Sequence, residues 1–319
     1  MDTTAPAPKI GLYVSSIVGG MRDGALGWRD LSAMARRAED VGFDSFWLPD
    51  HLLFRFAGEP AHGPWECWSL LCGLAAVTST IQLGSLVACT GYRNPALLAK
   101  MADTLDEISD GRLVLGLGAG WHEPEYLAYG YPFDHRFERF EEAVQMIRAL
   151  LRDGRLDFQG TYHTANDCEL RPRGPRPQGP PIMIGTLAGR PRMAQLIARH
   201  ADQWNGWLVH ARSYADQIPA LRETTDAACL AVGRDPATLE RTVGIAIDQQ
   251  PADESGLRYP DATPLTPGAR QPLTGSPETI AAELRRFAAE GITHIQVAPV
   301  LDGLAGIEAM APVITLLRA

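Results

Sequence analysis

One histidine stands where a buried strand gives way to a loop. The segment SFWLPDH ends in Asp50 and His51, and the apolar residues before this pair are typical of a core strand. Histidine changes its charge close to neutral pH, so it is the commonest general acid or base in enzymes. His51 is therefore the candidate catalytic residue. The alternative interpretation is a histidine that caps or fills the core.

A glycine-rich turn follows another predicted strand, RLVLGLGAG. Gly118 and Gly120 lie at its end, and Trp121 comes directly afterwards. Glycines at such a place either form a tight turn or let a ligand approach the backbone. Trp207 closes a further strand, QWNGWLV, in the same manner. Small residues and tryptophans at strand ends suit a flat ligand, and Trp121 and Trp207 are expected to shape the substrate side.

The loop after the strand PIMIGTL has the composition of an anion site. Gly185 and Thr186 end the strand, and Gly189 and Arg190 precede a predicted helix. Backbone N–H groups at a helix start attract anions, and a guanidinium adds a fixed fork of donors. A plain turn between strand and helix is the alternative interpretation.

These loops are positioned by strands and helices that alternate eight times. Such alternation predicts a parallel sheet, and eight units in this length match an α/β TIM (β/α)8 barrel with insertions, in which sites lie at the carboxyl ends of the strands. We expect one domain over residues 1–319, with a disordered lead at 1–8 and insertions at 155–181 and 249–275. An open doubly wound sheet is the alternative, but residues 15–20 lack its glycine fingerprint.

Two features of the insertions are specific. Residues 158–170 alternate around a glycine and suggest a hairpin, whereas residues 171–181 are rich in Pro, Gly and Arg and predict a loop. Residues 251–275 carry many Pro, Gly and Asp residues and little periodicity. A loop of this length is commonly functional, so it is a candidate lid over the site.

The composition of the chain limits the classes of molecule that it is expected to bind. The net charge of −9 and the pI near 5.4 argue against nucleic acid and anionic membranes, which require a basic face. The five cysteines form no CxxC pair and show no metal spacing, as expected for reduced thiols in a cytoplasmic protein without a bound metal. No apolar run reaches the roughly 18 residues of a membrane span. A small organic molecule is the expected partner.

Three stretches carry a family resemblance. They are YRNPALLAK at 92–100, LDEISDGR at 105–112, and GLGAGW at 116–121 with Glu125 beyond it. Together they resemble the luciferase-like monooxygenase superfamily, and within it the branch that depends on coenzyme F420. The resemblance spans nearly the whole chain and implies an oxidoreductase on a TIM barrel, usually dimeric, that binds F420 or reduced FMN.

The resemblance also implies site residues. A non-proline cis peptide at Leu86–Val87 would back the cofactor ring, with Thr90 nearby. Asp50 and His51 match the acid and the histidine that face this ring. Gly189 and Arg190 match the pair that holds the cofactor phosphate.

One position departs from the family pattern. The sugar-phosphate dehydrogenases of the family have glutamate directly after the glycines, where this chain has Trp121. This substitution argues against a sugar-phosphate substrate.

Three functions follow as hypotheses. The leading one is an F420-dependent oxidoreductase that moves a hydride between the deazaflavin and a small organic substrate, with a separate reductase supplying reduced cofactor. The second is a two-component monooxygenase that uses reduced FMN. The third is a barrel that binds a cofactor without catalysis.

Overall fold

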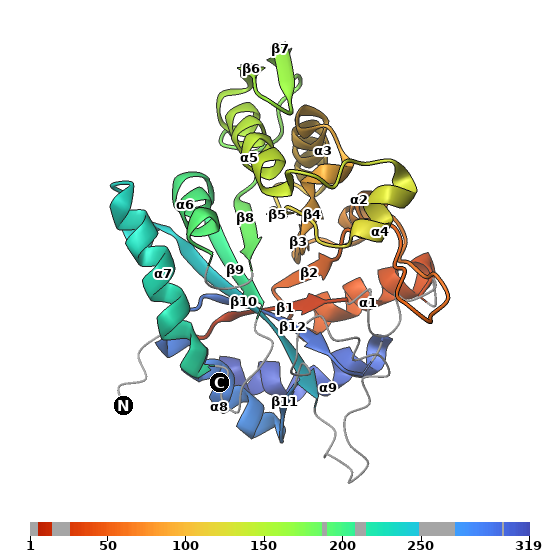
Figure 1. Cartoon of the computed structure of the whole chain (residues 1–319). Helices are drawn as coiled ribbons and strands as arrows, with labels where there is room; N and C mark the ends of the chain where they lie inside the picture. The colour runs from red at the N-terminus through yellow and green to blue at the C-terminus, as the bar shows by residue number, and fades with distance from the viewer. Residues whose placement is uncertain (1–5, 15–25, 187–189, 208–214, 249–271, 302) are drawn as a thin grey trace.

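The computed structural model describes residues 6–14, 26–186, 190–207, 215–248, 272–301 and 303–319. Parallel strands form its centre and helices cover them (Figure 1). The strands are β1 (Lys9–Tyr13), β2 (Ser45–Leu48), β3 (Gln82–Ser85), β4 (Ala88–Cys89), β5 (Leu113–Gly118), β6 (Arg155–Gln159), β7 (Thr164–Glu169), β8 (Ile182–Thr186), β9 (Gln203–Trp207), β10 (Glu240–Asp248), β11 (Leu273–Thr274) and β12 (His294–Pro299). The helices are α1 (Trp28–Val41), α2 (Cys67–Val77), α3 (Pro95–Ile108), α4 (Glu123–Tyr129), α5 (Arg136–Asp153), α6 (Pro191–His200), α7 (Ile218–Ala231), α8 (Pro277–Ala289) and α9 (Gly303–Arg318).

The central sheet closes on itself. Its ring runs β1-β2-β3-β5-β8-β9-β10-β12, every pairing is parallel, and β12 pairs with β1 to complete the circle. The short strands β4 and β11 pair with β5 and β10 outside this path. The predicted TIM barrel is confirmed, and the carboxyl ends of all ring strands consequently open on one face.

The helices form because their apolar residues recur at helical spacing and their first turns are capped. In α3, the Asn94 side chain accepts hydrogen bonds from the N–H groups of Ala96 and Leu97, and Pro95 occupies the first helical position, as predicted. The short helix α4 was not predicted. It begins without a side-chain cap and spans only 7 residues, so periodicity gave no signal for it.

The first insertion is a hairpin, as expected. β6 and β7 pair antiparallel and project from the barrel beside α5 (Figure 1). Of the second insertion, residues 249–271 lie outside the described part of the chain, so the lid stays a prediction.

Large side chains fill the barrel where glycines make room for them. Trp47 is fully buried and lies where a side chain on Gly84 would otherwise project. The Trp207 ring covers Gly244 in the same way. These glycines therefore let two strands of a narrow barrel each carry an indole inward.

Polar side chains also lie inside the barrel, below these indoles. His294 is 1% exposed, and its Nε2 lies 2.7 Å from Ser45 Oγ, which accepts a hydrogen bond from Trp47 Nε1. Burial lowers the pKa of His294 to about 3, and nearby Lys9 acts in the same direction. The imidazole is therefore neutral in the folded protein over the whole physiological range.

We predict that His294 makes the fold sensitive to acid. Between about pH 6.5 and 3, His294 is protonated in the unfolded chain but stays neutral in the native state. The free energy of unfolding therefore falls as the pH decreases from about 6.5 towards 3. The slope from this group approaches about 1.4 kcal/mol per pH unit. Urea unfolding at pH 7, 6 and 5 measures it, and His294→Gln should flatten the dependence by that amount. An unchanged slope in the variant contradicts the assignment.

Candidate active site

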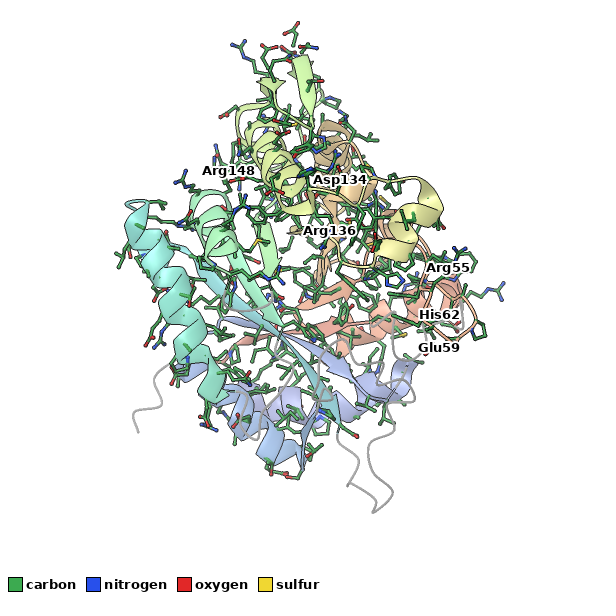
Figure 2. The ribbon with its side chains drawn as sticks, in the orientation of Figure 1. Arg55, Glu59, His62, Asp134, Arg136 and Arg148 are labelled. Carbon is green, nitrogen blue, oxygen red and sulfur yellow. The ribbon has the colours of Figure 1, made fainter. Side chains whose placement is uncertain are left out.

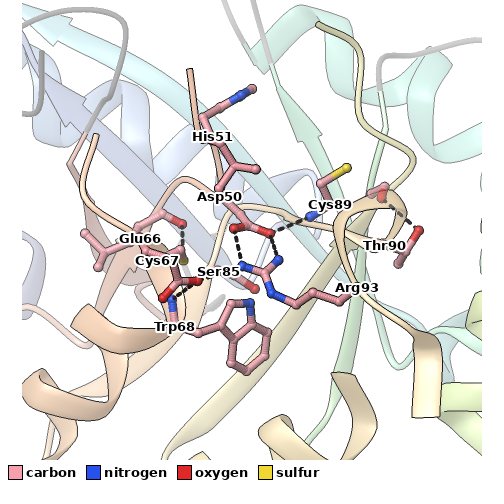
Figure 3. A network of polar contacts seen from close by, with 12 residues as sticks. Asp50, His51, Glu66, Cys67, Trp68, Ser85, Cys89, Thr90 and Arg93 are labelled. Carbon is pink, nitrogen blue, oxygen red and sulfur yellow. Dashed lines mark hydrogen bonds and ion pairs between the residues drawn. The ribbon is translucent and has the colours of Figure 1, made fainter. Parts of the chain in front are cut away.

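The end of β2 carries a buried ion pair (Figure 3). Asp50 is 2% exposed, and Arg93 donates to both of its carboxylate oxygens at 2.6 and 3.0 Å. The N–H of Cys89, at the end of β4, donates to the same carboxylate at 2.9 Å. The carboxylate is therefore engaged by protein donors, and Asp50 ties β2 to the segment after β3.

Arg93 extends this network to the start of α2. Arg93 Nη2 also donates to Glu66 Oε1 at 2.7 Å. Glu66 in turn caps α2, because its carboxylate accepts hydrogen bonds from the N–H groups of Trp68 and Ser69. Burial by itself lowers the pKa of Arg93, but the carboxylates of Asp50 and Glu66 outweigh it and raise that pKa. The guanidinium is a permanent cation that joins three elements of the barrel.

His51 points away from this pair (Figure 3) and meets a second buried carboxylate. Its Nδ1 lies 2.8 Å from Glu125 Oε1, and the Glu125 side chain has no exposed surface. The other Glu125 oxygen accepts from the N–H groups of Leu52 and Leu53, at 2.9 and 3.2 Å. Glu125 comes from α4 and thereby fixes the backbone directly after His51.

The protonation of this pair follows from its contacts. Burial raises the pKa of Glu125, but the hydrogen bonds from His51 and from the Leu52 N–H outweigh it, so the pKa lies below its ordinary value. An ionised carboxylate only accepts, so Nδ1 of His51 carries the hydrogen. No described residue hydrogen-bonds to the other ring nitrogen, Nε2. Such a nitrogen is suited to proton transfer with a ligand.

An apolar surface, here called the mouth floor, lies at the carboxyl ends of the ring strands. It consists of Tyr13, Leu86, Val87 and Trp207, which pack together over the buried Trp47. The Tyr13 and Trp207 rings meet edge to face at 5.4 Å. The peptide bond between Leu86 and Val87 is cis, as the family resemblance implied.

The glycines at the mouth have a structural role beside the predicted one. A Cβ on Gly118 would lie 2.5 Å from one methyl of Val87, and a Cβ on Gly185 would lie 2.9 Å from the other. The positions of Gly118 and Gly185 must therefore both be glycine for Val87 to lie between the two strands. Gly120 has a φ of +69° and lies against Tyr126, which again requires glycine. Their contact with a cofactor stays a prediction.

The other predicted cofactor residues are spread around the mouth. Thr90 is buried, and its hydroxyl lies 3.4 Å from the carbonyl oxygen of Gly118. Thr186 is half-buried at the end of β8, and Arg190 is exposed just before α6. Gly189 lies outside the described residues. The anion site at this loop therefore stays a prediction.

A basic cavity of about 240 Å³ opens beside the mouth, beyond the ends of β4 and β5. Its cationic lining comes from Arg93, Arg136 and Arg139, and aromatic residues lie beside them. His163 also lines the cavity, and burial lowers its pKa. Arg136 projects from the start of α5 (Figure 2) and donates to the Gly120 carbonyl at 2.7 Å. This cavity was not predicted, because its residues come from a loop, a helix and a hairpin.

The described part of the chain contains neither a cluster of metal ligands nor a helix that could span a membrane. No group of three or more His, Cys, Asp or Glu side chains is placed there to hold a metal ion. Within the same residues, no helix combines the length and apolar character needed to cross a bilayer.

The sequence and fold of this chain are similar to those of known proteins. The model of the family described as luciferase-like monooxygenase matches residues 9–252. The chain belongs to this family. An F420-dependent glucose-6-phosphate dehydrogenase of Amycolatopsis mediterranei is 32% identical over 274 residues, which cover 83% of this chain and 78% of that protein.

A second relative and a solved structure are also similar to this chain. The pyrimidine monooxygenase RutA of Cronobacter sakazakii is 40% identical over 179 residues, which cover 53% of this chain and half (50%) of that protein. The solved structure of an F420-dependent secondary alcohol dehydrogenase, in complex with an F420–acetone adduct, shares the fold with a TM-score of 0.79 at 21% identity. It covers 98% of this chain and is itself covered completely. The predicted family and fold are confirmed.

We predict that the Asp50–Arg93 pair is essential for stability. Arg93→Met leaves a buried carboxylate without its partner, which should lower the free energy of unfolding by about 3–5 kcal/mol. Asp50→Asn in the same chain should restore part of the loss, because the uncompensated charge is gone. Urea unfolding measures both.

The control is Arg37→Met, since Arg37 pairs with Glu308 on the surface with both side chains largely exposed. It should leave the urea midpoint nearly unchanged. Equal effects of the Arg93 and Arg37 variants contradict the role given to Asp50.

Proposed function

We propose that this family member is an F420-dependent oxidoreductase that transfers a hydride between the deazaflavin and a small organic substrate. The observation that carries the proposal is the His51–Glu125 pair beside the mouth floor. It offers one histidine nitrogen for proton transfer at the end of the barrel where active sites lie.

The comparisons favour F420 over FMN as the cofactor. The F420-dependent relative aligns with 83% of the chain, whereas RutA aligns with 53%. The second candidate is a monooxygenase that uses reduced FMN, and the higher identity of the RutA segment, 40%, favours it. In either case we infer that a separate reductase supplies the reduced cofactor.

The residues at the mouth fit such a cofactor. Val87 and Trp207 offer an apolar surface against which a tricyclic ring could pack. Arg136 and Arg139 in the basic cavity suit the phosphate of its side chain, with Arg190 as the alternative anchor predicted from the sequence. The bound deazaflavin would supply the hydride chemistry, and the protein would supply orientation and a proton.

The side chains have separate tasks in this mechanism. Nε2 of His51 exchanges a proton with the oxygen or nitrogen of the substrate. Glu125 holds the ring in one tautomer and stabilises the imidazolium when it forms. The apolar floor excludes water from the face of the ring that it covers, and low polarity strengthens these electrostatic interactions.

The first test is binding of the two cofactors to the purified protein. We expect F420 to bind with a micromolar or lower Kd and to exceed the affinity for FMN at least tenfold. Arg139→Leu should weaken F420 about tenfold through loss of a charged contact. Arg192→Leu, which removes an exposed arginine on α6, is the control and should leave Kd unchanged. Tight FMN binding without F420 binding would establish the monooxygenase alternative instead.

The second test concerns Glu125. Glu125→Gln removes the negative charge and permits the opposite His51 tautomer, so kcat should fall about 10- to 100-fold while the Kd for F420 changes little. Glu125→Asp should recover part of the activity. An unchanged kcat in Glu125→Gln excludes the positioning role.

A further inference from the structure

Aromatic side chains surround His51 on the side of the β2 and β5 loops. The Phe54 ring lies 4.5 Å from the His51 ring, and Trp121 meets His51 edge to face at 5.6 Å. His122 packs on Trp121 at 5.1 Å and on Phe56 at 5.2 Å. We call Phe54, Phe56, Trp121 and His122 the aromatic wall. Trp121 is its exposed member, with 37% of its surface accessible.

The polar ring that belongs to the wall, His122, is already engaged. His122 is 5% exposed, and its Nε2 already accepts the N–H of Arg55 at 3.1 Å. Burial lowers the pKa of His122, which keeps it a neutral acceptor. A ligand next to His51 therefore meets aromatic carbon and the edge of an indole.

Positive charge lies elsewhere. The cationic side chains of the basic cavity line a space that includes neither His51 nor Trp121. Arg55 is exposed on its loop (Figure 2), whereas His62 of the same loop is 5% exposed and packs on Phe54 and Phe56. The nearest charge to His51 is the Glu125 carboxylate, which repels anions. In the described part of the site, the substrate side is thus apolar and disfavours phosphates.

We propose that the substrate is an uncharged, flat carbonyl compound, an aryl or cyclic ketone, stacked between the cofactor ring and Trp121. This inference rests on the proposed function and assigns its substrate class. In the reduction, the carbonyl carbon receives a hydride from the reduced deazaflavin and the oxygen receives the proton from His51 Nε2. The C=O π bond is replaced by C–H and O–H bonds, the deazaflavin is oxidised by two electrons, and water returns a proton to His51.

Turnover of matched ketones tests the substrate class. With reduced F420, kcat/KM for acetophenone should exceed that for acetone at least tenfold, and glucose 6-phosphate should not react. Trp121→Ala should lower kcat/KM for acetophenone about tenfold, mainly through KM, and leave acetone within about twofold. Trp121→Phe should keep most of the preference. Better turnover of acetone or glucose 6-phosphate, or an equal loss for both ketones, overturns the proposal.

A binding measurement separates this proposal from the proposed function. Acetophenone should quench tryptophan fluorescence of the cofactor-free protein, and Trp121→Phe should abolish that saturable quenching. Trp65→Phe removes another exposed tryptophan and is the control, in which quenching should persist. If Trp121 is quenched but no ketone turns over, the redox function is refuted and binding of the ketone at the aromatic wall is supported. If both ketones turn over equally well and Trp121 is not quenched, the substrate class proposed from the aromatic wall is refuted and the redox function is retained.

Discussion

The buried ion pair between Asp50 and Arg93 is the constraint on which the site depends. A carboxylate without exposed surface is stable only because a guanidinium and a backbone N–H satisfy it. The pair fixes the end of β2, and His51 is the next residue along the chain. Through Glu66, the same guanidinium also fixes the start of α2. The backbone before His51 is thus set by a contact that His51 does not make, and its ring is oriented by the contact with Glu125.

Around this anchor the mouth divides into three surfaces with different chemistry. The floor is apolar, and Val87 lies in it where Gly118 and Gly185 leave room. The aromatic wall adjoins His51, and the basic cavity lies beyond the ends of β4 and β5. A ligand with a flat ring, a phosphate and a reacting partner would meet a matching surface for each part. This division supports a cofactor and an apolar substrate bound together.

The sequence was sufficient for the barrel but not for the contacts within its mouth. Strands and helices alternate with clear periodicity, so the ring and even the hairpin at β6 and β7 were predicted. Glu125 is 74 residues from His51, and nothing in local spacing indicates that they touch. Gly118 and Gly185 were interpreted as turn residues or as places for a ligand, because the side chain that needs their space, Val87, comes from a different segment. Long-range packing of this kind leaves no local pattern.

The most direct test of the central claim is a crystal structure of the protein with F420. The account predicts the deazaflavin ring on the mouth floor against Val87, its phosphate in contact with Arg136 or Arg139, and Nε2 of His51 facing the reacting side of the ring. A cofactor bound away from the floor, or a ring whose reacting side does not face His51, contradicts the account.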